Sequence, residues 1–196
     1  MRQYSSTRQA GFSLVELAVV LVIVALLIGG MLLPLSAQRD VRSQAETQKG
    51  LAEIREALIG YAIINGKLPC PMLTSTTDPA NAAYGMAPST CSPGGEGYLP
   101  WKTLGVNEVD AWGQKRAAST DPFTGYWRYR VDDSFSVAFT LSSTASQLSV
   151  KDAAANMLTE ASPNAPVAVV FSTGANQTAD GLNGDGTANE YQTGDG

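Results

Sequence analysis

The sequence contains no histidine and only two cysteines among its 196 residues. Histidine is the commonest general base and the commonest metal ligand in proteins, so its absence removes the most frequent catalytic and metal-binding arrangements. The motifs G-x-S-x-G and H-E-x-x-H and the phosphate-binding P-loop are absent as well. A Ser–Lys pair or two carboxylates can act without histidine, but no specific pair is indicated. We therefore do not expect an enzyme.

Positive charge is also scarce. Lys and Arg number 13 against 18 Asp and Glu, which gives a formal net charge of −5. The longest basic run is the pair Lys115 and Arg116. Surfaces that bind nucleic acids carry clusters of Lys and Arg. No nucleic acid is expected as a partner.

The long apolar run covers residues 12–33, in which only Ser13 and Glu16 have polar side chains. A helix of this length rises about 33 Å, enough to cross the hydrocarbon core of a bilayer. The preceding residues include two arginines and no acidic residue, which favours a cytoplasmic location for that flank. A secretory signal has its cleavage site after a shorter apolar core, whereas here the plausible processing residue, Gly11, comes before it.

Glu16 needs an explanation, because a carboxylate in hydrocarbon costs roughly 2.5–3.5 kcal/mol on insertion scales. Cleavage after Gly11 would make Phe12 an N-terminal amine four residues before Glu16. The two charges would then neutralise each other, within one chain or between chains displaced along the helix axis. A glutamate that stays protonated or reaches the headgroups is the alternative.

The stretch GFSLVELAVVLVIVALLIGG resembles the N-terminus of type IV pilins and type II secretion pseudopilins. Their pattern is a short basic leader, Gly, usually Phe, a Glu four residues further on, and an apolar helix. The resemblance implies that prepilin peptidase cuts between Gly11 and Phe12 and methylates the new amine. It also implies that Glu16 pairs with the amine of an adjacent subunit. Pro34 lies near a position where these proteins often carry a proline, and it either loosens the helix for assembly or marks the end of the membrane segment.

The resemblance implies a subunit of a type IV pilus-like or type II secretion pseudopilus filament, with other pilin or pseudopilin subunits as partners in a helical homo- or hetero-filament. The expected location is the bacterial inner membrane before assembly and a periplasmic or extracellular filament afterwards. The alternative function is a single-span membrane protein whose outer domain binds a ligand or peptide without polymerising. The expected organisation is a leader (1–11), a transmembrane and assembly helix (12–34), its amphipathic continuation (35–66) and a globular head (67–196).

The continuation of the helix has an apolar stripe, because Leu51, Ile54, Leu58 and Tyr61 recur at spacings of 3, 4 and 3. Asn65 and Gly66 then provide a helix stop, so the helix is predicted over residues 12–64. Its striped half must pack against another element. The predicted fold class is α+β and pilin-like, with the second half of the helix on a small antiparallel sheet of three or four strands.

In the head, strands are predicted over residues 126–131, 135–141 and 166–172, the last of them central, and a short helix over 151–161. The segment DAWG before the first strand is similar to the D-P-W-G segment of pseudopilin heads. Residues between Cys70 and Cys91 show no periodicity and are predicted as a surface loop. In an exported chain these two cysteines would form a disulfide, and two buried free thiols are the alternative.

The C-terminal tail is acidic and rich in glycine. Pseudopilin heads often hold a calcium ion in a C-terminal loop, which the stretch TADGLNGDG distantly resembles. That resemblance implies Asp180, Asn183, Asp185 and Asp195 as calcium ligands, although the EF-hand spacing is not met. A solvated loop without a metal is the alternative, so no cofactor is certain. Pseudopilin heads often continue into another strand beyond the position of Gly196, which leaves open a truncated sequence or a loose tail.

Overall fold

The computed structural model describes residues 13–73, 78–92, 95–121, 123–140, 144–152, 156–175 and 191–192. The side chains of residues 28–37, 152 and 191–192 lie outside this description. The chain forms two compact units, an N-terminal unit, Met1–Arg42, and a head unit, Ser43–Gly196. The head unit thus contains the predicted globular head together with the second part of the long helix.

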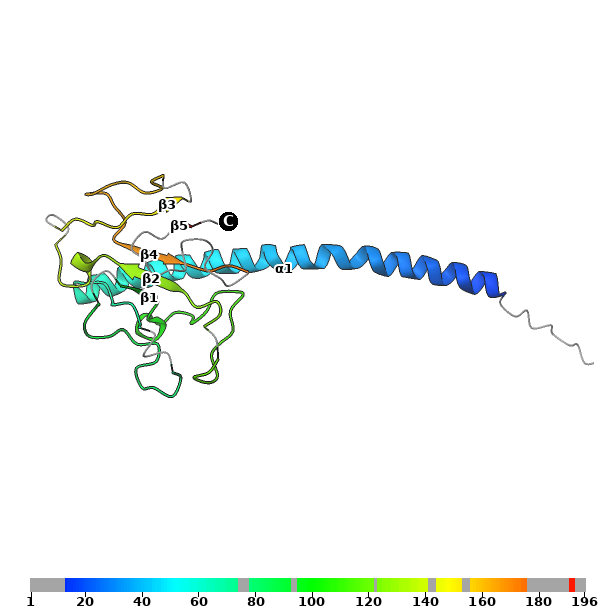
Figure 1. Ribbon diagram of the computed structural model, residues 1–196, viewed down its shortest axis with the longest axis horizontal. Coiled ribbons are helices and arrows are strands. Elements are labelled where there is room, and N and C mark those ends of the chain that lie inside the picture. The colour runs from blue at the N-terminus through cyan, green and yellow to red at the C-terminus, as the bar shows by residue number, and fades with distance from the viewer. Residues whose placement is uncertain are drawn as a thin grey trace, which may run out of the picture. The chain divides into compact units, whose positions relative to one another are not determined.

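The long helix, α1, runs from Leu14 to Asn65, within two residues of its predicted bounds (Figure 1). Its end is built as the sequence predicted. Gly66 adopts the left-handed conformation with a φ of 66°, and its N–H donates to the Ala62 carbonyl at 2.8 Å. The Asn65 side-chain amide donates to the Tyr61 carbonyl at 2.9 Å. These bonds satisfy carbonyls that the helix end would otherwise leave without partners.

The main sheet of the head unit is antiparallel and consists of β1 (Glu96–Tyr98), β2 (Arg128–Val131) and β4 (Ala168–Phe171), in the order β1-β2-β4. Side chains alternate along β2, with Tyr129 and Val131 buried and Arg128 and Arg130 half-buried. This period of two confirms the predicted half-buried strand. Arg128 forms an ion pair with Glu96 on β1.

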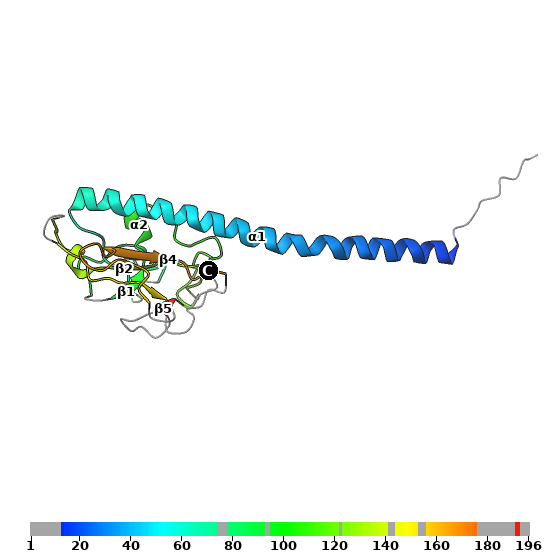
Figure 2. The ribbon, with the colours of Figure 1, turned by 90° about the horizontal axis from the view of Figure 1, so that it is seen from above.

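The core lies between α1 and this sheet, and Figure 2 shows α1 across one face of the strands. Ile54 and Leu58 of the predicted stripe are 1% and 7% exposed, and they belong to one cluster with Trp127, Tyr129 and Val131. The stripe therefore packs on the sheet as predicted, because burial of apolar surface favours that arrangement.

Two predicted strand positions are wrong. The 166–172 strand exists as β4, but β2 is central in the sheet, because β1 pairs with its other edge. The described part of residues 135–141 contains no strand. Instead Asp133–Phe135 forms a 3₁₀ helix, η2. The reason is the Asp132 carboxylate, which accepts a hydrogen bond from the Ser134 N–H at 2.9 Å and so stabilises a turn that is incompatible with a strand.

The helix predicted over residues 151–161 is also wrong. Lys151–Asp152 forms a short strand, β3, which pairs in parallel with β5 (Tyr191–Gln192). Val150 donates to the Thr159 hydroxyl at 3.0 Å and accepts from the Leu158 N–H at 2.8 Å. The Leu158 N–H, which a helix would need for its bond to the carbonyl four residues earlier, thus bonds to Val150 instead, and these contacts override the helical propensity of the segment.

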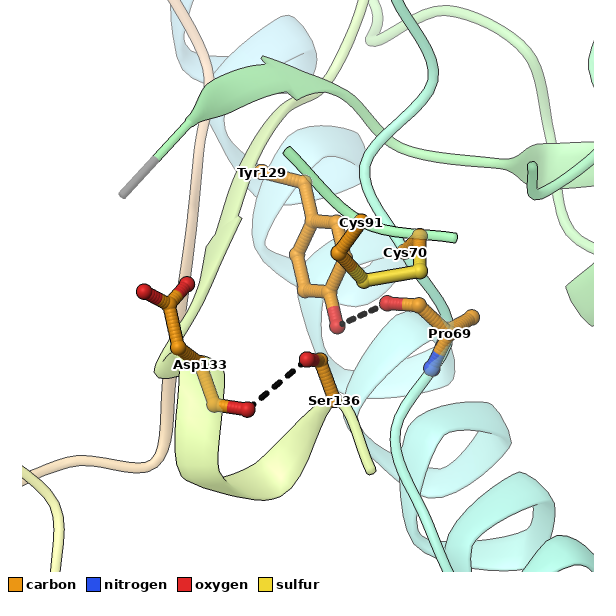
Figure 3. Close-up of a disulfide and its surroundings, with 6 residues drawn as sticks. All are labelled: Pro69, Cys70, Cys91, Tyr129, Asp133 and Ser136. Atoms are coloured by element: carbon orange, nitrogen blue, oxygen red, sulfur yellow. Dashed lines mark hydrogen bonds between the residues drawn. A yellow bond between two sulfur atoms is a disulfide. The ribbon is translucent and has the colours of Figure 1, made fainter. Parts of the chain in front are cut away.

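The disulfide between Cys70 and Cys91 is present, with a Cα–Cα distance of 5.0 Å. Figure 3 shows it beside Tyr129, whose hydroxyl donates to the Pro69 carbonyl at 3.0 Å. The sequence predicts a surface loop for the segment that the disulfide closes, but part of this segment is buried. Its residues Met72 and Tyr84 are buried in a second core cluster, which also contains Trp101 of the short helix α2 (Trp101–Leu104) and Tyr126.

Candidate processing and assembly site

The first turn of α1 is capped by Ser13. The Ser13 hydroxyl accepts a hydrogen bond from the Glu16 N–H, and the Ser13 carbonyl accepts one from the Leu17 N–H, both at 3.2 Å. Because α1 begins at Leu14, Ser13 is the N-cap and Glu16 is the third helical residue. Ser-x-x-Glu at these positions is the capping-box pattern, which satisfies backbone donors at a helix start. The sequence carried this signal, but the interpretation of Ser13 as merely a polar residue in an apolar run missed it.

Glu16 is the acidic residue in the first turn of α1. The backbone N–H groups at a helix start carry partial positive charge, so a carboxylate is favoured there. Glu16 is exposed in the described chain. Gly11 and Phe12 lie outside the described residues, so the pairing of Glu16 with the Phe12 amine stays a prediction.

Apolar side chains cover the surface of α1 after this turn. Eleven large apolar residues between positions 14 and 27 are exposed: Leu14, Val15, Leu17, Val19, Val20, Leu21, Val22, Ile23, Val24, Leu26 and Leu27. They occupy all sides of the helix, since several are consecutive in sequence. A helix that is apolar all round is stable only when something apolar covers it.

In the part of the chain that the structure describes, we find no helix with the length and hydropathy needed to cross a membrane. Of the predicted membrane segment, residue 12 and the side chains of residues 28–34 lie outside the description. The backbone of α1 continues through Pro34, so this proline does not end the helix. Its predicted role in assembly is a proposal.

The head unit contains a buried carboxylate, Asp110, in the DAWG segment. One Asp110 oxygen accepts from the N–H groups of Trp112 and Gly113 at 2.9 and 2.8 Å, and the other accepts from the Ser172 hydroxyl. The N–H of Asp110 donates to the Gly125 carbonyl at 2.8 Å. One carboxylate oxygen therefore holds the turn and the other joins it to Ser172, so Asp110 has a structural role.

A second polar cluster joins Tyr84, Glu108 and Tyr126. Both tyrosine hydroxyls donate to Glu108, and the two hydroxyl oxygens lie 2.8 Å apart. Burial, together with the bond to Glu108, raises the pKa of Tyr84, and burial raises the pKa of Tyr126. Both hydroxyls consequently stay protonated at neutral pH and act as hydrogen-bond donors that fasten the disulfide-closed segment to the head.

The residues predicted to bind calcium, Asp180, Asn183, Asp185 and Asp195, lie outside the described residues. Among the described residues, no group of three or more His, Cys, Asp or Glu side chains is arranged to hold a metal ion. The structure therefore leaves calcium binding by the tail as an expectation from the sequence.

Residues 6–32 match the family model of the prokaryotic N-terminal methylation motif, which is the signature of type IV pilins and pseudopilins. The match spans Gly11, Phe12 and Glu16 as well as the Ser13 cap. No curated protein and no solved structure matches the chain. The motif is that of a structural protein and not of an enzyme family. It supports a type IV pilin-like or pseudopilin precursor that is processed by prepilin peptidase.

Proposed function

We propose that the protein is a structural subunit of a type IV pilus-like or type II secretion pseudopilus filament. The observation that carries this proposal is the start of α1, where a self-capped first turn containing Glu16 leads into a helix that is apolar on all sides. The match to the N-terminal methylation motif covers this same segment. Before assembly, the apolar part of α1 would be held in the bacterial inner membrane, and afterwards it would be covered by the helices of neighbouring subunits.

Processing and assembly are linked through charge. Cleavage after Gly11 creates an amine at Phe12, whose methylated form remains cationic. In a bundle of apolar helices this amine and the Glu16 carboxylate are strongly favoured as a pair, because either charge left without a partner is costly. An amine from one subunit can reach the carboxylate of the next at one particular stagger, so the pair would fix the displacement between neighbouring subunits.

The experiment replaces Glu16 with alanine in cells that assemble the filament. Membrane insertion should be retained, since removing a charge from hydrocarbon eases partitioning. Assembly should be lost, because breaking one side of a buried pair typically costs about 3–5 kcal/mol for each subunit added. Asp40→Ala, which removes another carboxylate from α1, is the matched control and should assemble. Sheared filaments and membranes are compared by immunoblotting.

Wild-type incorporation of the Glu16→Ala protein would contradict the role of this carboxylate. A wild-type chain that keeps its leader and stays in the membrane as a single subunit would contradict the filament subunit itself. That second result would favour the alternative of a single-span protein with an outer binding domain.

A further inference from the structure

The head unit has an open groove between α1 and the residues that follow α2, and Figure 2 shows α2 beside this stretch of α1. The lining combines apolar and charged side chains. The apolar part comes from Ala52 and Ala57 of α1 and from Leu104 and Val106; the polar part comes from Lys49, Glu53, Glu56 and Asn107. This groove, called the α1–α2 groove below, therefore offers an apolar strip beside two carboxylates.

The two carboxylates are available to a new partner at little cost. Lys49 Nζ lies 3.7 Å from Glu53, and Arg55 Nη1 lies 3.3 Å from Glu56. All four side chains are more than half exposed. Ion pairs of this kind contribute little to stability, because water screens them and holding two long side chains together costs entropy. An arginine from another molecule can therefore replace either partner.

A matching surface lies in the N-terminal unit, on the turn of α1 that carries Arg39, Val41 and Arg42, which are called the basic turn below. Val41 is 65% exposed, and it is the only exposed large apolar side chain among residues 38–58. Arg39 and Arg42 are exposed as well, and their i, i+3 spacing places them next to each other, on one side of Val41. Gln38, Val41 and Arg42 lie on one face of the helix, because their spacing is i, i+3 and i+4. The basic turn thus presents an apolar side chain next to cationic ones.

We propose that the α1–α2 groove of one subunit binds the basic turn of a second copy of this chain. Val41 would lie on the strip formed by the two alanines, and the arginines would face Glu53 and Glu56. This is the helix-in-groove mode of recognition, in which apolar anchors supply affinity and rim charges set orientation. The proposal rests on the proposed filament function.

The geometry also gives the contact a direction. The groove and the basic turn are different surfaces, so the contact between two copies is heterologous. A heterologous contact that does not close into a ring repeats along an open helical assembly. The contact displaces the two helices by about 12–24 Å, whereas the pair of Phe12 and Glu16 displaces them by about 6 Å, so the two contacts join different pairs of subunits. Each subunit would use its groove toward one subunit and its basic turn toward another, and the filament would be polar.

The test is a cross-link between subunits. The variant Val41→Cys/Ala52→Cys is assembled, and sheared filaments are treated with a short bismaleimide. The native cysteines do not react, because they form the Cys70–Cys91 disulfide. We expect a ladder of covalent oligomers on denaturing gels, and no ladder from either single variant. Asp40→Cys/Ala52→Cys is the matched control, since residue 40 points about 100° away from residue 41 on the helix, to the side opposite the arginines. It should cross-link at least about tenfold less.

A charge exchange provides a second, independent measurement. Glu53→Lys/Glu56→Lys and Arg39→Glu/Arg42→Glu should each lower incorporation into filaments at least about tenfold, because like charges then meet. The combined fourfold variant should recover to within about threefold of wild type. Tryptophan fluorescence of the purified chains confirms that each variant is folded.

The outcomes separate the two proposals. If the Val41→Cys/Ala52→Cys variant forms filaments at the wild-type level without the cross-link, the groove is not the site for the basic turn. A fourfold variant no better than its parents would overturn the proposal as well. A cross-link to a different protein would overturn the second copy as its occupant. Failure of the wild-type chain to form any filament would instead contradict the proposed function.

Discussion

Replacing Asp132 with asparagine should destabilise the head unit by about 2–3 kcal/mol at neutral pH. The Asp132 side chain is almost fully buried, at 6% exposure. Its carboxylate accepts hydrogen bonds from the N–H groups of Ser134 and Gln147, at 2.9 and 2.7 Å, and from the Ser146 hydroxyl at 3.1 Å. One side chain therefore holds together η2 and a segment 14 residues further along the chain.

The magnitude follows from which donors lose a partner. Asparagine keeps one oxygen, which can still accept from Ser134, but its amide group faces the Gln147 N–H with another donor. Ser146 can donate instead to the Pro166 carbonyl, which lies 2.7 Å away. The main loss is thus one bond to a charged acceptor, worth about 1.5–3 kcal/mol, with a smaller contribution from Ser146.

The effect should depend on pH in a defined direction. Burial alone would raise the pKa of Asp132, but the hydrogen bonds from Gln147, Ser134 and Ser146 outweigh it and lower the pKa below its usual range. The folded state then binds a proton more weakly than the unfolded state. The stabilisation is complete above the unfolded pKa of about 3.9 and is lost as the pH falls through the lower folded pKa.

The assay is urea unfolding of the full chain in a mild non-ionic detergent, followed by tryptophan fluorescence. All three tryptophans belong to the head unit, so the signal reports on that unit. Glu160→Gln, which removes an exposed carboxylate, is the matched control and should change stability by less than about 0.5 kcal/mol. A difference between Asp132→Asn and wild type below that value at pH 7, or an equally large difference at pH 3, would refute the reasoning.

Processing, the disulfide and the packing of α1 give three further predictions. Gly11→Val should block cleavage, so that mass spectrometry finds the intact precursor; a mature chain starting directly after residue 11 would contradict the assigned site. Replacing both cysteines with serine should lower the free energy of unfolding by roughly 3 kcal/mol. Reduction of the wild-type protein should have the same effect. An unchanged urea midpoint would argue against a stabilising disulfide. Gly50→Val should lower the free energy of unfolding by about 1–3 kcal/mol, because a Cβ there would lie 2.9 Å from the Trp127 ring. Gly60→Val is the control, because a Cβ at residue 60 has nothing within 4 Å. It changes helix propensity without this clash and should lower the free energy of unfolding clearly less in the same assay.

The parts of the fold that follow from local periodicity could be predicted from the sequence. The stripe with Ile54 and Leu58 predicts both α1 and its buried face, and the alternation around Tyr129 predicts β2. That η2 and not a strand follows β2 could not be predicted from this periodicity. The Asp132 carboxylate that stabilises η2 is itself held by Gln147, a residue whose proximity is visible only in three dimensions.

In the candidate site, too, local arrangements could be predicted from the sequence, whereas contacts between distant residues could not. The Ser13 cap and Glu16 lie three residues apart, so sequence spacing contains their whole arrangement. The partners of Asp110 and Tyr84 are separated from them by as many as 62 and 42 residues, and no local pattern relates them. The α1–α2 groove likewise exists only once α2 has been placed against α1 by the fold.

The Ser13 cap changes how proteolytic maturation should be understood. The first hydrogen bonds of α1 are made by Ser13, Glu16 and Leu17, all on the C-terminal side of the proposed cut after Gly11. These hydrogen bonds, among the described residues, therefore do not depend on the leader. What the cut changes is charge, because a neutral peptide group becomes a cationic amine next to a preformed turn that contains Glu16. Maturation would then act as an electrostatic step at constant backbone geometry, and the precursor would already possess the helix that the mature subunit uses.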